Sequence, residues 1–138
     1  SLRQMSKLSI RIYYEDTDAG GVVYYANYLK YIERGRSEML REAGFEQERV
    51  NKDFGVLFVV RKVTANYLKP AKFDDLIEVQ TEIKSSGKAS LIFSQKIMNI
   101  KQSTVLFDAE VKVVSVLTQN FKPCGIPQVI SEKLNGRK

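Results

Sequence analysis

The sequence contains no histidine, and its only cysteine is Cys124. A Ser-His-Asp or Cys-His catalytic site is therefore excluded within one chain or a homo-oligomer of it. A zinc site built on histidine or on several cysteines is excluded too, and a lone cysteine cannot form an intramolecular disulfide. Acid–base chemistry near neutral pH must then come from Asp, Glu, Lys, Tyr or Cys side chains.

Long hydrophobic runs are also missing. No stretch approaches the roughly 18 apolar residues of a membrane-spanning helix, and residues 1–7 lack the apolar core of a secretory signal. We therefore expect a cytoplasmic protein without a transmembrane segment. The chain has no internal repeat, and its 138 residues are the size of one domain, so we expect a single domain over residues 1–138.

The composition has an excess of positive charge, with a net charge of +6. A basic surface favours a polyanionic partner, which could be nucleic acid, a membrane surface or a phosphorylated small molecule. It can also simply keep a protein in solution. No basic run with interleaved aromatic residues is present, so we do not expect nucleic-acid binding.

Alternating apolar and polar residues predict five strands. In the first, Leu8, Ile10, Ile12 and Tyr14 fall on one face. The predicted strands are Lys7–Tyr14, Val56–Tyr67, Leu76–Ser85, Ser90–Ile100 and Thr104–Val116. Helical spacing predicts one long helix over Asn27–Ala43, which Gly44 ends, and a short helix near Val129–Leu134.

Gly35 lies in the middle of the long helix, where glycine costs up to about 1 kcal/mol relative to alanine. It indicates that the helix lies close on a sheet. The order of one strand, one long helix and four strands predicts an α+β fold, in which a five-stranded antiparallel sheet wraps around the helix. One helix cannot protect both sheet edges, so we expect two copies to associate edge to edge.

The segment between the first strand and the helix is a loop that combines acids with the pair Gly20-Gly21. The first N–H groups of a helix have no intrahelical partners and can bind an anion or a developing oxyanion. A carboxylate a few residues earlier could attack a carbonyl or activate water while these amides polarise its oxygen. The alternative is that Asp16 or Asp18 merely caps a turn.

The segment Tyr13–Tyr28, continued by Tyr31–Leu40, resembles the signature of the hotdog-fold thioesterases of the 4-hydroxybenzoyl-CoA thioesterase superfamily. It is most similar to the Tol-Pal-associated acyl-CoA thioesterase family, YbgC. The resemblance extends over most of the chain, and Gly35 stands where alanine is usual. Comparable segments of that family match Phe58–Lys62, Pro70–Asp75 and Lys122-Pro123.

The resemblance implies hydrolysis of an acyl-CoA, or of an acyl group on acyl carrier protein, with Asp18 as nucleophile or general base. The backbone N–H of Tyr25 would be the oxyanion donor, and Tyr14 falls on an active-site tyrosine. The family commonly has histidine at the position of Tyr25, and this exchange leaves the backbone N–H unchanged. Three neighbouring residues are expected to contact the substrate: Gly20, Gly21 and Val22.

Coenzyme A would be part of the substrate, so no cofactor and no metal is expected. Its phosphates suit basic side chains, and in such enzymes loops of this kind line the CoA groove at the interface of a homodimer or homotetramer. Candidate CoA-binding residues are Arg61, Lys62, Lys88 and Ser90. Short-chain, aromatic and longer acyl groups all stay open as substrates.

Other functions are less consistent with these residues. A non-hydrolytic acyl-CoA-binding protein of the same fold is the main alternative. Hotdog dehydratases generally use a histidine, which this chain lacks. Cys124 as a nucleophile would need a base to lower its pKa, and the sequence offers no obvious one nearby.

Overall fold

The computed structural model describes residues 5–135 of the chain. The elements follow the order β1 (Ser6–Arg11), η1 (Tyr14–Asp16), α1 (Asn27–Glu42), α2 (Gln47–Phe54), β2 (Val56–Tyr67), β3 (Leu76–Ser86), β4 (Ser90–Asn99), β5 (Thr104–Leu117) and α3 (Gln128–Asn135). The five strands, the long helix and the short C-terminal helix are confirmed. Only η1, a short 3₁₀ turn, and α2 were not predicted.

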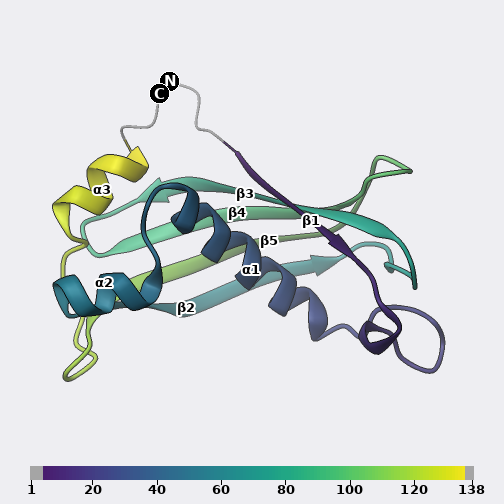
Figure 1. Cartoon of the computed structure of the whole chain (residues 1–138), viewed down its shortest axis with the longest axis horizontal. Helices are drawn as coiled ribbons and strands as arrows, with labels where there is room; N and C mark the ends of the chain where they lie inside the picture. Colours follow the sequence, from purple (N-terminus) through teal and green to yellow (C-terminus); the bar gives the residue numbers. More distant parts are fainter. Residues whose placement is uncertain (1–4, 136–138) are drawn as a thin grey trace.

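All five strands form one antiparallel sheet in the order β1-β3-β4-β5-β2. The long helix α1 lies across one face of this sheet and packs against β3, β1 and β4 (Figure 1). The predicted α+β hotdog architecture is therefore confirmed. The strands β1 and β2 form the two edges, so the outer side of the twelve-residue strand β2 is unpaired in one chain.

The strand register defines two ends of the sheet. At one end Arg11 lies opposite Leu76, and Tyr67 lies opposite Phe107. At the other end β3 and β4 are joined by the hairpin around Gly87. Eleven residues of β3 separate these ends, which at about 3.3 Å per residue is roughly 35 Å. The loop after β1 and the β3–β4 hairpin therefore lie at opposite ends of the molecule (Figure 1).

Helix α1 approaches the sheet most closely at Gly35. A Cβ atom there would lie 2.7 Å from both Thr81 Oγ1 and Val79 Cγ1. Both contacts are to short β-branched side chains of β3, which have little room to move. The predicted reason for a glycine in mid-helix, a close approach to the sheet, is thus confirmed.

A buried polar network joins the helix to the sheet at the same level. Gln95 is 1% exposed and donates to the carbonyl oxygen of Ile32 (2.8 Å) and to Thr81 Oγ1 (2.9 Å). Its own oxygen accepts a bond from Arg36 (3.0 Å), whose pKa is lowered by burial. Every polar atom of the Gln95 amide group is therefore bonded, as a buried amide requires.

The first strand ends earlier than predicted. Instead of running to Tyr14, β1 ends at Arg11 and the chain enters the η1 turn, in which Asp16 N–H donates to the carbonyl of Tyr13 (3.0 Å). Tyr14 is 80% exposed and lies in η1, so its prediction as the last residue of the strand is wrong. The alternation of apolar and polar residues in the sequence continues beyond Arg11, where turn hydrogen bonds replace the pairing of β1 with the sheet.

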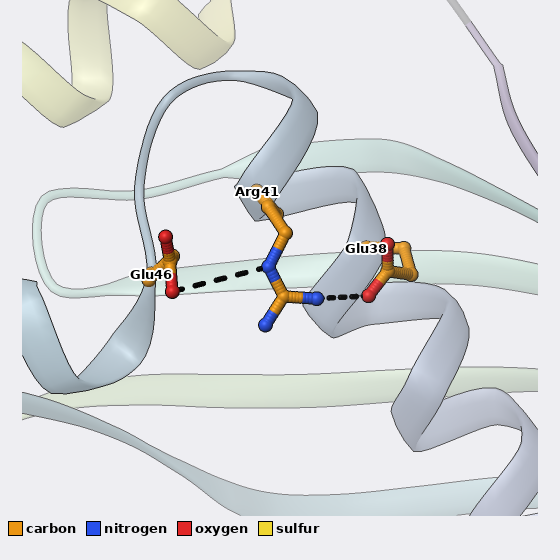
Figure 2. Close-up of polar contacts among 3 residues, drawn as sticks. All are labelled: Glu38, Arg41 and Glu46. Atoms are coloured by element: carbon orange, nitrogen blue, oxygen red, sulfur yellow. Dashed lines mark hydrogen bonds and ion pairs between the residues drawn. The ribbon is translucent and has the colours of Figure 1, made fainter.

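Helix α2 follows α1 after a short connection, and Arg41 interacts on both sides of it. Its guanidinium is hydrogen-bonded to Glu38, one turn earlier in α1, and lies 4.0 Å from Glu46 at the start of α2 (Figure 2). All three side chains are largely in solvent, so each ion pair contributes only about 0–1 kcal/mol. Within residues 5–135, no helix is long and apolar enough to cross a membrane.

Candidate active site

The loop between β1 and α1 is itself folded as a small hairpin. Thr17 and Val23 form an antiparallel bridge, and Asp18 N–H donates to the carbonyl of Val22 (2.9 Å). The turn is closed by Gly21 N–H on the carbonyl of Asp18 (3.0 Å). Gly21 has a φ of +82°, in the left-handed region that favours glycine, so the Gly-Gly pair serves a tight turn here.

Residues 71–73, just before β3, hold this hairpin in place. Val23 N–H donates to the carbonyl of Ala71 (2.8 Å), and Val22 forms a bridge with Lys72. The buried hydroxyl of Tyr28 in α1 accepts a bond from Ala71 N–H (2.9 Å). The loop is therefore bonded to the segment before β3, and this same segment is bonded to α1.

The two aspartates of the loop make different contacts. Asp16 is half-buried, and its Oδ2 accepts a bond from Tyr13 N–H (2.8 Å). Asp18 is exposed, and its Oδ1 accepts a bond from Gly20 N–H (2.8 Å). Each acid thus does cap a turn, as the alternative interpretation held. Among the described residues, however, none bonds the second carboxylate oxygen of Asp18, which leaves that oxygen open to solvent.

Helix α1 begins directly after the hairpin with a tight turn. Asn27 N–H donates to the carbonyl of Tyr24 (2.9 Å), and Tyr28 N–H donates to that of Tyr25 (3.3 Å). The N–H groups of Tyr25 and Ala26 donate to no other group in residues 5–135. A pair of unbonded amides at a helix start carries partial positive charge and can stabilise an oxyanion.

The side chain of Tyr25 is 63% exposed and belongs to an aromatic cluster. Its ring centroid lies 4.9 Å from that of Tyr24 and 6.3 Å from that of Tyr67. A hydrogen bond between the two tyrosine side chains raises the pKa of Tyr24. Tyr67, at the end of β2, was missed by the sequence analysis, because only the β2–β5 pairing brings it beside α1.

Tyr14 is not joined to Asp18 by any contact among the described residues. Its ring makes an edge contact with Phe73 at 5.4 Å between centroids. It lines an open hollow that Asp18 does not line, whose other residues are Arg11, Ile12, Tyr13, Glu15, Phe73 and Asp74. A catalytic role of Tyr14 remains a prediction.

The candidate CoA-binding residues lie away from Asp18 in the same chain. Arg61 and Lys62 are exposed on the edge strand β2, and Arg61 is the extra residue of a β-bulge opposite β5. Lys88 and Ser90 belong to the β3–β4 hairpin at the far end of the sheet. One chain thus joins Asp18, Gly20, Gly21 and Val22 in one hairpin, three residues before Tyr25 in the sequence, whereas the basic candidates Arg61, Lys62 and Lys88 lie elsewhere. No group of three or more potential metal ligands occurs within residues 5–135.

Comparisons with known proteins identify the family. The model of the thioesterase superfamily matches residues 20–106. The chain is 50% identical over 121 residues to the acyl-CoA thioester hydrolase YbgC of Escherichia coli O6:H1, covering 88% of this chain and 89% of that protein. It is 36% identical over 132 residues to the acyl-CoA thioesterase YbgC of Helicobacter pylori strain 26695, covering 91% and 96%.

A solved structure agrees with these relatives. The crystal structure of a probable thioesterase from Bartonella henselae superposes with a TM-score of 0.84 at 33% identity, covering 90% of this chain and all of that one. The matched regions include the loop glycines, α1 and most of the sheet. The chain therefore belongs to the thioesterase superfamily, in its YbgC family, and is a thioester hydrolase.

Proposed function

We propose that the chain hydrolyses acyl-CoA thioesters, with Asp18 as nucleophile or general base and the Tyr25 N–H as oxyanion donor. The observation that carries the proposal is the pairing, within one loop, of an exposed carboxylate with unbonded amides at a helix start. The relatives named as acyl-CoA thioester hydrolases support the acyl-CoA substrate.

Either role of Asp18 leads to the same products. As a general base, it takes a proton from water, which attacks the thioester carbonyl. As a nucleophile, it forms a mixed anhydride that water then hydrolyses. In both cases the C–S bond breaks and a C–O bond forms. The carbonyl oxygen becomes an oxyanion opposite the Tyr25 N–H, and the thiolate of CoA leaves and takes up a proton.

The distance between the two ends of the sheet supports a dimeric site. A second copy can pair antiparallel along the free edge of β2, where Val60 and Val63 are 50% and 40% exposed. Because β2 runs from the hairpin end to the loop end, a two-fold axis across this edge would bring Lys88 of the partner subunit toward Tyr25. Arg61 and Lys62 lie on the same edge, so we propose that the CoA phosphates lie along it.

The proposed chemistry can act on several thioester substrates. We propose CoA as the carrier and acyl carrier protein as a second one. The acyl group would enter beside the exposed aromatic side chains at the helix start. Short-chain, aromatic and longer acyl groups belong in one assay panel.

A thiol-release assay with Asp18→Asn tests the proposal. We expect kcat to fall roughly 10²-fold or more, because the amide is neither a base nor a nucleophile. Asp53→Asn, which changes an exposed acid of α2, is the matched control and should retain full activity. Full turnover in Asp18→Asn would reject the proposed catalyst. Tight acyl-CoA binding without thiol release by the native protein would instead favour a non-hydrolytic binding protein.

Single-turnover hydrolysis in ¹⁸O-labelled water separates the two roles of Asp18. A general base delivers solvent oxygen, so the product of the first turnover carries the label. When water attacks the Asp18 carbonyl of a mixed anhydride, the first product is unlabelled and the label enters Asp18. Attack on the acyl carbonyl labels the product as a general base does, so label found in Asp18 is the result that identifies a nucleophile.

A further inference from the structure

The backbone carbonyl of Asp16 accepts two hydrogen bonds from the start of α1. One comes from Tyr24 N–H (3.1 Å) and the other from the side-chain Nδ2 of Asn27 (2.9 Å). Asn27 is the first residue of α1, and its side chain reaches back to the loop. The peptide that contains the Tyr25 N–H lies directly between these two donors in the chain.

The carboxylate of Asp16 holds the other side of the loop. Its Oδ2 accepts the N–H of Tyr13, just after β1. It also faces Tyr31, a side chain of α1 that is only 1% exposed. Burial, and after it the charge of Asp16, raise the pKa of the Tyr31 hydroxyl. This hydroxyl has no partner at normal hydrogen-bond geometry within residues 5–135.

We propose that Asp16 and Asn27 are positioning residues, which together hold the Asp18 carboxylate in register with the Tyr25 N–H. The inference rests on the proposed function and assigns separate tasks to the two aspartates of the loop. Asp16 bonds the end of β1 through its carboxylate and the start of α1 through its carbonyl. Asp18, two residues later, keeps one oxygen free for the substrate.

Small displacements matter at such a site. A misplacement of about 1 Å between reacting groups can lower the rate roughly 10²-fold. Asp18 is bonded to its own hairpin, and Tyr25 lies in the turn that leads into α1. The carbonyl of Asp16 is bonded to the residue before Tyr25 and to Asn27 two residues after it. It therefore sets the distance between the hairpin and the helix amides.

The side chain of Asn27 gives direct experimental access to this contact. Asn27→Asp keeps the shape but replaces the N–H₂ donor by a carboxylate, which repels the Asp16 carbonyl oxygen. We expect kcat to fall about 10-fold with KM changed less than about 3-fold, and Asn27→Ser, with a short donor, to lie in between. If Asn27 acted only at the helix start, Asn27→Asp should leave both stability and kcat unchanged, because an acid is favourable in the first turn of a helix. Asn120→Asp, in a loop at the far end of the sheet, is the matched control.

A second readout needs no substrate. Amide hydrogen exchange of Tyr24, measured by NMR on the free protein, reports its bond to the Asp16 carbonyl. We expect Asn27→Asp to speed this exchange several-fold, while Asn120→Asp leaves it unchanged. Unchanged kcat, or unchanged exchange at Tyr24, in Asn27→Asp overturns the proposal. If Asp18→Asn keeps full turnover, the proposed function fails, and the exchange rate alone then decides whether Asn27 holds the helix start.

Asp16→Asn tests the separation of tasks between the acids. The amide keeps an oxygen for Tyr13 N–H but removes the charge that faces Tyr31. We expect kcat to fall about 10-fold, well short of the loss in Asp18→Asn, because the catalyst is displaced but still present. A loss in Asp16→Asn as large as that in Asp18→Asn would make Asp16 the catalyst and overturn the proposal.

Discussion

The two ends of the sheet are built differently. At the loop end, backbone hydrogen bonds fix Asp18, and Tyr25 lies in the turn that leads into α1. At the hairpin end, Lys88 is an exposed side chain on a surface turn. Under the proposed function, the chemistry would depend on a preformed backbone, whereas CoA binding would depend on separate surface charges. Changes at the loop end should lower kcat, and changes at the hairpin end should raise KM.

A glycine at each end gives the sharpest form of this comparison. Gly21 has a φ of +82° with open space around it, so alanine there is strained by its backbone alone. This strain is about 1–2 kcal/mol, and relief of it would shift the turn that carries Asp18. We expect Gly21→Ala to lower kcat about 10-fold in the thiol-release assay.

Gly87, in the β3–β4 hairpin, is the matched control. Its backbone needs no left-handed conformation, and an added Cβ would meet only Ser90 Oγ at 3.2 Å. We expect Gly87→Ala to leave kcat within about 2-fold of the native value, because a surface serine can rotate away. An equal loss of kcat in both variants would break the distinction between the two ends.

Most of the fold could be predicted because its signals are local. Residues 27–43 repeat apolar side chains at helical spacing, and residues 77–84 alternate, so both elements were found within a few residues. Helix α2 was missed because only Val50 of its eight residues is buried, which leaves no apolar stripe to recognise. The neighbours in the sheet, with β2 beside β5, follow from long-range packing that no local pattern encodes.

The candidate site divides in the same way. The acids, the glycines and the helix start lie within one short segment, so the sequence could place Asp18 and Tyr25 in one loop. It could not show that Asp16 faces Tyr31, or that Tyr67 from β2 joins the aromatic cluster, because both contacts cross between elements. The distance between Lys88 and Asp18 likewise depends on strand register alone.

Basic side chains provide the second test of the comparison. We expect Lys88→Gln and Arg61→Gln each to raise KM for an acyl-CoA about 3- to 10-fold with kcat unchanged, since each removes one phosphate contact. The effect should shrink as the salt concentration rises, because screening already weakens such contacts. Steady-state kinetics at two ionic strengths measure both quantities.

Lys96→Gln is the control for these variants. Lys96 is an equally exposed lysine on β4, remote from the free edge of β2. Its loss changes the net charge by the same amount but should leave KM within about 2-fold, because distant surface charges are screened. If all three variants raise KM equally, the basic surface acts through its total charge, and no specific CoA contact lies at Lys88 or Arg61.

The smallest effect is expected where the chain departs from its family. Tyr25→His exchanges an exposed ring that contacts Tyr24 and Tyr67 but leaves the backbone N–H in place. We expect kcat within about 3-fold of the native value, because the oxyanion donor is kept and only two exposed ring contacts change, each worth about 0.5–1.5 kcal/mol of stability. Tyr25→Pro removes the N–H itself at the second position of the turn that Asn27 N–H closes on Tyr24, a position at which proline is tolerated. The proline variant should therefore fold yet lose activity by roughly 10²-fold, as expected for the removal of an oxyanion donor. The opposite ranking, with an inactive histidine variant and an active proline variant, would assign the role of this position to the phenol, and the donor would then have to be the Ala26 N–H.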